Sequence, residues 1–185
     1  MKILIYSETT AATIKTNLGL PEYSYYFVLK EFLPALCELG EVVIVEQPAL
    51  EVDAIYAQCL AAGEPCVFLA FAPPNKTPIH FHCPTISVFA WEFDSIPNEC
   101  WLNDPSQDWG YMLRQQGQAI THSAFTVATV HELLGARYPV ISVPAPVWDH
   151  FEDIRSSAQW EPTAVRSFQL AKGVVLDSRA IDLAD

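Results

Sequence analysis

The stretch Ser87–Pro97, SVFAWEFDSIP, joins an apolar run to two carboxylates and then stops at a proline. The apolar run predicts a strand over residues 85–91 that is covered on both faces. If this strand is central in a sheet, Glu92 and Asp94 lie where an open α/β protein binds its ligand. If it is an edge strand, they are ordinary solvated charges.

The rest of the chain repeats this pattern and favours a central strand. Short, continuous apolar runs predict further strands at 2–6, 42–45, 66–72, 119–121, 140–143 and 173–176, and helical spacing predicts helices at 22–39, 52–62, 109–116 and 124–134. Alternation of buried strands with helices is typical of a parallel sheet. We therefore predict an α/β, Rossmann-like doubly wound fold: a mostly parallel sheet of about six or seven strands with helices on both faces.

The 185 residues suffice for one domain. We expect residues 1–148 to form the Rossmann-like domain. Residues 149–185 mix aromatic and charged side chains and are interpreted as a tail or linker.

Composition excludes several classes of function. The net charge is −12, and between residues 51 and 113 eight acids meet one base, Lys76. A negative net charge is unfavourable for binding a phosphate backbone, so we predict no nucleic-acid partner. No apolar run is long enough for a transmembrane segment. Residues 1–6 lack the features of a signal peptide, which predicts a cytoplasmic protein whose five scattered cysteines are reduced.

Polar side chains follow the predicted strands where an open parallel sheet collects its ligands. They include Glu8, Trp91, Glu92, Asp94 and His122. One interpretation is structural: Trp91 fills the core, and the acids cap the next helix. The other is a carbohydrate site, where an aromatic face packs on a sugar ring and carboxylates accept hydroxyl hydrogen bonds.

Two further segments are candidates for a metal site or a cofactor site. In TPIHFHCP, His80 and His82 precede Cys83, but no further ligands follow at convincing spacing, so no metal is predicted. Two interpretations of His80 remain open: it contacts a substrate, or it is simply solvated. The loop after the first strand contains only Gly19 where a dinucleotide site needs a glycine-rich turn. We predict no cofactor, and the loop is either a lid over the cleft or a plain connection.

A family resemblance rests on four segments in order: FAWEFDSIPNECW (89–101), DW (108–109), AITHSAFTVATVHELLG (119–135) and PVISVPAPVW (139–148). Together they resemble the N-terminal, acceptor-side domain of two-domain (GT-B) nucleotide-sugar glycosyltransferases of the retaining family-four type. GVVLDSRAIDL (173–183) looks like the approach to a second domain. The resemblance implies that a C-terminal domain, absent from this chain, binds the nucleotide-sugar donor, and that the fragment alone is inactive.

The resemblance also implies roles for individual residues. Glu92 is the expected catalytic carboxylate, and the acceptor side is expected to comprise Glu8, Gly19, His80, Trp91, Asp94 and His122. Two features depart from the family. Trp91-Glu92 stands where many relatives have a histidine, and Gly19 is alone where many have two glycines.

The implied function is transfer of a sugar, with mannose as one candidate, from a nucleotide sugar to a glycan acceptor in polysaccharide biosynthesis. Peripheral membrane association of the full-length enzyme and a homodimer stay open. The alternative is a non-catalytic α/β module that binds carbohydrate or protein through the same rim.

Overall fold

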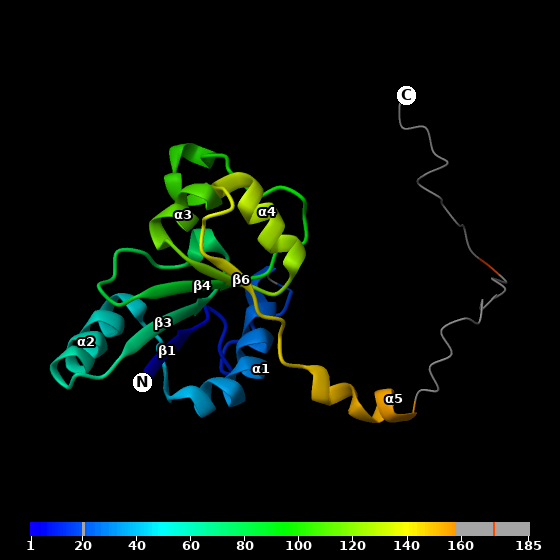
Figure 1. Cartoon of the computed structure of the whole chain (residues 1–185), viewed down its shortest axis with the longest axis horizontal. Helices are drawn as coiled ribbons and strands as arrows, with labels where there is room; N and C mark the ends of the chain where they lie inside the picture. The colour runs from blue at the N-terminus through cyan, green and yellow to red at the C-terminus, as the bar shows by residue number, and fades with distance from the viewer. Residues whose placement is uncertain (20, 158–171, 173–185) are drawn as a thin grey trace. The chain divides into compact units, whose positions relative to one another are not determined.

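A computed structural model describes residues 1–19, 21–157 and 172 of the chain. Within them, six strands form one sheet in the order β2-β1-β3-β4-β5-β6 (Figure 1). All neighbouring strands are parallel, which confirms the predicted fold class. The strands are β1 (Lys2–Tyr6), β2 (Glu41–Ile44), β3 (Cys66–Phe71), β4 (Thr85–Phe89), β5 (Ala119–Thr121) and β6 (Val140–Ser142).

The sheet carries helices on both faces because its side chains alternate between them. The main helices are α1 (Ser24–Leu39), α2 (Pro48–Ala61), α3 (Trp109–Gln116) and α4 (Ala124–Leu134). On one face, Phe71 of β3 meets Phe32 of α1, with ring centroids 5.7 Å apart. On the other, Phe89 of β4 meets Trp109 of α3 at 6.0 Å. Phe68 lies on this second face, in the cluster that α2 covers.

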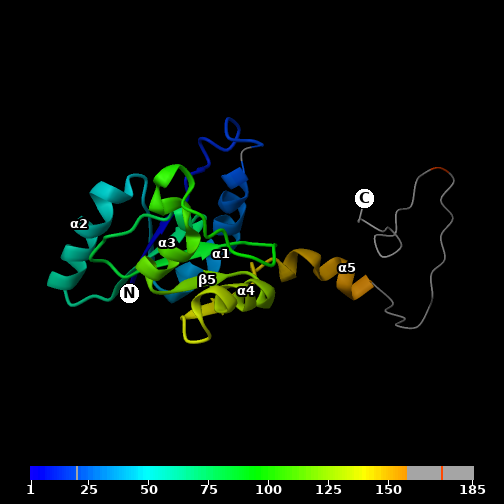
Figure 2. The same cartoon turned by 90° about the horizontal axis from the view of Figure 1, so that it is seen from above.

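The views agree with this assignment. Figure 1 shows α1 on the opposite side of the sheet from α3 and α4. Figure 2, turned by 90°, shows α3 and α4 side by side, and the two helices contact each other. Helix α1 leads from β1 to β2 at one edge of the sheet, whereas β3, β4, β5 and β6 follow one another towards the opposite edge. The strand order therefore reverses between β1 and β3. The region beyond the carboxyl ends of these two strands is the topological switch point of the sheet.

Helix ends mostly follow local sequence signals. The Ser123 hydroxyl accepts a hydrogen bond from the Thr126 amide and caps α4, as predicted. Gly117 follows α3 in the left-handed conformation, with φ of 76°. Helix α2 begins at Pro48, earlier than predicted, because the Glu51 carboxylate accepts hydrogen bonds from the amides of Glu46 and Gln47 just before it.

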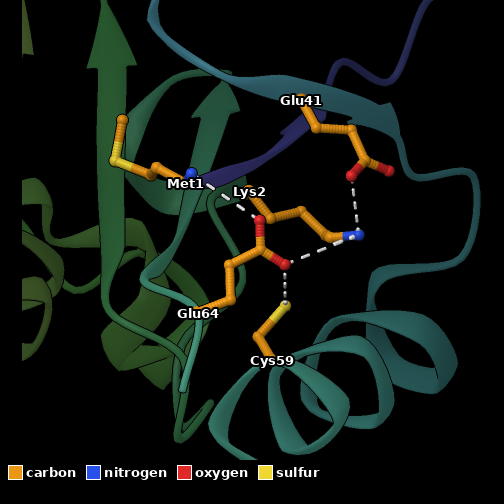
Figure 3. A network of polar contacts seen from close by, with 5 residues as sticks. All are labelled: Met1, Lys2, Glu41, Cys59 and Glu64. Carbon is orange, nitrogen blue, oxygen red and sulfur yellow. Dashed lines mark hydrogen bonds and ion pairs between the residues drawn. The ribbon is translucent and has the colours of Figure 1, made fainter. Parts of the chain in front are cut away.

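The amino edge of the sheet is held by a polar network (Figure 3). Lys2 of β1 bonds the Glu41 carboxylate of β2 at 3.1 Å and lies 3.9 Å from Glu64, which stands two residues before the start of β3. The other Glu64 oxygen lies 3.6 Å from the amino group of Met1. The Cys59 thiol, on α2, donates to Glu64 at 3.9 Å. One carboxylate therefore connects β1 with α2 at the edge remote from the strand ends that carry the candidate site.

The shorter helices are 3-10 turns in the connections: η1 (Pro21–Tyr23), η2 (Pro74–Lys76), η3 (Trp101–Asn103) and η4 (Pro105–Gln107). Residues 1–149 form one compact unit, and the chain from residue 150 onward belongs to another. Near that boundary lie η5 (Trp148–Phe151) and α5 (Glu152–Ser157). The strand predicted at 173–176 lies outside the described residues.

The structure also bears on expectations drawn from composition. In the part of the chain that it describes, no helix combines the length and the apolar character needed to cross a bilayer. All five cysteines are free thiols. Cys59, Cys66 and Cys83 are buried in the core beneath α2, as expected of core thiols.

Candidate functional site

Strand β4 ends at Phe89, two residues before the predicted end, because its next backbone groups bond to other elements. The Ala90 amide donates to the hydroxyl of Tyr25, on α1, at 3.3 Å. The Trp91 carbonyl accepts from the Thr126 hydroxyl, on α4, at 2.6 Å. These two bonds turn the chain out of the sheet and fix the position of Glu92.

The Thr126 bond belongs to a relay of hydroxyl groups. Because the single hydroxyl hydrogen of Thr126 goes to Trp91, the Ser123 hydroxyl is the donor in its own contact with Thr126, at 2.9 Å. Ser123 also accepts from the Thr126 amide at 3.1 Å. The N-terminal cap of α4 therefore also anchors the residue that precedes Glu92.

Trp91 is a packing residue as well as a rim residue. Its ring lies 4.6 Å from that of Trp109 and 5.0 Å from that of Phe93, and its indole N–H donates to the Ser95 carbonyl at 2.7 Å. The structural interpretation of Trp91 thus holds in part, because the side chain packs against the core. The indole nitrogen is already bonded, so what Trp91 offers a ligand is apolar surface.

A hollow of about 350 Å³ lies at the carboxyl ends of β4 and β5. It brings three of the predicted residues together, namely Trp91, Glu92 and His122. The Glu92 side chain is exposed and has no hydrogen-bond or ion-pair partner among the described residues. The remaining lining comes from Ala90, Ser123, Phe125 and Thr126.

His122 is held in one orientation by its surroundings. Its Nδ1 donates to the Val143 carbonyl at 3.0 Å, and its ring lies 5.7 Å from that of Phe32. In the neutral ring this assigns the acceptor role to Nε2. Nε2 is buried and has no partner within the described chain. The hollow thus combines an exposed carboxylate and apolar surface with a histidine whose buried Nε2 lacks a hydrogen-bond partner in the described chain.

Tyr25 is a neighbour of this hollow that sequence reasoning missed. Burial raises the pKa of its phenol to about 12, and the negative charges of Glu22 and Glu92 add to the effect. The hydroxyl therefore stays protonated at neutral pH, and its oxygen accepts the hydrogen bond of the Ala90 amide. No local pattern could reveal it, since the contact with Ala90 spans 65 residues.

Asp94 lines a different, neighbouring hollow of about 490 Å³ between the same loop and α4. The loop contributes Glu99 and the exposed Trp101, and α4 contributes Glu132. All charged groups that the described part of the chain contributes to its lining are carboxylates. The structure therefore separates Asp94 from Glu92, although only Phe93 lies between them in the sequence.

Glu8 lies at the topological switch point and is already engaged. Lys76 bonds the Glu8 carboxylate at 3.1 Å and that of Glu22 at 3.0 Å. Burial by itself would lower the pKa of Lys76, but the two carboxylates outweigh it and raise that pKa. The cluster joins the loops after β1 and β3 to the start of α1.

Gly19 and His80 are placed apart from the hollow that contains Glu92. Gly19 lies in the connection from β1 to α1, with φ of 90°, a conformation that suits glycine. His80 lines a hollow with Thr85 and Gln118, at the amino ends of β4 and β5. The structure therefore puts His80 at the opposite edge of the sheet from Glu92.

Potential metal ligands do not converge in the described chain. In residues 1–19, 21–157 and 172, no group of three or more histidine, cysteine, aspartate or glutamate side chains could hold a metal ion. His82, beside the histidine considered above, instead meets the Asp53 carboxylate through its Nδ1 at 3.0 Å and through its amide at 2.9 Å.

Comparisons with known proteins add no identification. The chain matches no family model, and no curated protein and no solved structure matches it significantly.

Proposed function

We propose that residues 1–149 are the acceptor-side domain of a glycosyltransferase that moves a sugar from a nucleotide sugar to a glycan. One observation carries the proposal. The free carboxylate of Glu92 lines a hollow at the carboxyl edge of a parallel sheet together with His122, whose buried Nε2 has no partner in the described chain.

The chemistry of this hollow suits a polyhydroxylated ligand. Sugar hydroxyl groups donate hydrogen bonds to carboxylate and imidazole acceptors, while the C–H face of the ring packs on Trp91 and Phe125. Glu92 also serves as the general base that takes the proton of the attacking hydroxyl. Its fixed backbone, held through Thr126, keeps this carboxylate at the rim.

The same hollow is poorly suited to the donor. Among the described residues, its lining contains no lysine or arginine that could neutralise a diphosphate. The proposal therefore assigns the nucleotide sugar to a second domain, which meets this one across the hollow. The resemblance noted in the sequence points in the same direction.

A ligand titration of the chain tests the proposal. Saturation-transfer NMR with a mannose-containing oligosaccharide should detect weak binding that Glu92→Gln and His122→Ala each reduce. Glu38→Gln, the same change at an exposed glutamate of α1, is the matched control and should bind like the unmodified chain. A nucleotide sugar that binds more tightly than the oligosaccharide would contradict the assignment of the donor to another domain.

The alternative function, a non-catalytic binding module, has a distinct outcome. It predicts that glycan binding is lost in the same variants, but that the full-length protein transfers no sugar from any nucleotide sugar. Binding that is insensitive to both Glu92 and His122 removes the site from either function.

A further inference from the structure

A second cavity, of about 180 Å³, opens on the α1 face of the sheet, beside the ends of β1 and β2. Its walls are mostly apolar and include Leu29 and Leu33 of α1 and Ile44 and Val45 at the end of β2. An apolar cavity of about 150 Å³ is known to admit benzene, so this one has room for a ligand of that size.

The polar side chains of the lining are hydroxyl groups and one ammonium group, all of which can donate hydrogen bonds. Ser7 is 7% exposed, and its hydroxyl is buried without a hydrogen-bond partner in the described chain. Ser7 continues the alternation of Ile3 and Ile5, which places its side chain on the α1 face with the cavity. A buried, unpaired hydroxyl is costly, so a ligand that accepts its hydrogen bond would remove a penalty.

Two neighbours add to this donor character. The Thr9 hydroxyl, 2% exposed, accepts from the Asn17 side chain at 3.1 Å and still has its own hydrogen to donate. Lys30 of α1 lines the cavity and makes no ion pair with a described carboxylate. Although the net charge of the chain is −12, no acid is among the described residues that line this cavity.

From this lining we infer that the cavity binds a small carboxylic acid whose apolar body is about the size of one benzene ring. The carboxylate accepts from Ser7 and Thr9 and is neutralised by Lys30. The body packs among Leu29, Leu33 and the end of β2. This site is separate from the hollow that contains Glu92, with which it shares no lining residue.

A calorimetric titration with three probes of one shape tests this inference. Benzoate is the anion, benzyl alcohol its neutral analogue and benzylamine the cation. We expect affinity in that order, with benzoate about tenfold or more above the alcohol because its bonds are charge-assisted. Equal binding of all three, or no heat from benzoate at millimolar concentration, overturns the inference.

Two variants locate the binding. Lys30→Met on exposed helix surface should bring the ratio of benzoate to benzyl alcohol affinity towards one, and Ser7→Ala should weaken benzoate about fivefold or more. Arg137→Met removes an exposed cation elsewhere and is the matched control. If Ser7→Ala fails to fold, Lys30→Met still tests the inference, because the Lys30 side chain is exposed and not part of the core. A ratio that Lys30→Met and Arg137→Met alter equally assigns the effect to net charge and overturns the site.

Discussion

The hydroxyl of Tyr25 and the backbone amide of Ala90 are hydrogen-bonded at 3.3 Å, and this bond connects α1 to the first residue beyond β4. It joins the face covered by α1 to the rim that carries Glu92. The phenol is buried, whereas Ala90 is exposed. The buried Tyr25 side chain therefore contributes both to the stability of the fold and to the position of the chain that leads to Glu92.

Tyr25→Phe should flatten the dependence of stability on alkaline pH. The folded pKa of Tyr25 is raised to about 12, against about 10 for a free phenol. The protonated phenol therefore stabilises the fold fully below about pH 10, and this contribution is lost as the pH rises through about 12. A shift of this size corresponds to about 2 to 3 kcal/mol.

Urea unfolding at a series of pH values measures the effect. Burial also raises the pKa of the Cys83 thiol, to about 12, and that of the Tyr138 phenol, so the unmodified chain loses stability in this window through other groups as well. The variant should keep the contributions of Cys83 and Tyr138 and lose that of Tyr25. Parallel curves for the two proteins would show that Tyr25 ionises freely in the folded state.

Thr126→Val should destabilise the fold by about 1 to 3 kcal/mol, because it leaves the Trp91 carbonyl without its hydroxyl donor. The side chain is 1% exposed, and valine has nearly the same shape. Chemical denaturation measures the loss. Thr126→Ser, which retains the hydroxyl, is the control and should recover glycan binding that Thr126→Val reduces.

Gly40→Ala should be disruptive although the backbone there is extended. A Cβ at this position would lie 2.2 Å from the Met1 carbonyl oxygen, which already accepts from the Glu41 amide at 3.0 Å. Separating the starts of β1 and β2 should cost about 1 to 3 kcal/mol. Hydrogen exchange of the Glu41 amide should accelerate as well.

Gly63→Ala is a useful comparison for this prediction. A Cβ there would meet nothing within 4 Å, but its φ of 67° disfavours alanine. It should cost about 1 to 2 kcal/mol and leave the Glu41 amide protected. Slow exchange of Glu41 in both variants would show that β1 and β2 tolerate the added methyl group.

Glu92→Gln in the full-length enzyme should lower turnover about tenfold or more, as expected for a group that moves a proton or stabilises charge. Glutamine keeps the shape and removes the charge. Steady-state kinetics measure kcat and KM separately. A change in KM alone would restrict Glu92 to acceptor binding, and unchanged kinetics would make it a structural residue.

Much of the fold follows from local sequence. Continuous apolar runs marked all six strands of the described sheet, and Ser123 and Gly117 marked helix ends, because these signals depend on neighbouring residues only. The sequence pattern predicts the end of β4 two residues too late, at Trp91 instead of Phe89. Its apolar run continues to Trp91, but contacts with α1 and α4 take over its backbone.

By itself, the sequence determined that strands and helices alternate, that the central strands are buried, and that Glu92 and His122 follow two of the strands. Only the tertiary structure decided that these two side chains share a hollow, that His80 lies at the opposite edge, and that Ser7 faces a cavity beside Lys30. The physical reason is the distance along the sequence over which each kind of interaction acts. Strand and helix signals act between residues a few positions apart, whereas a site depends on strand order and on contacts between distant segments.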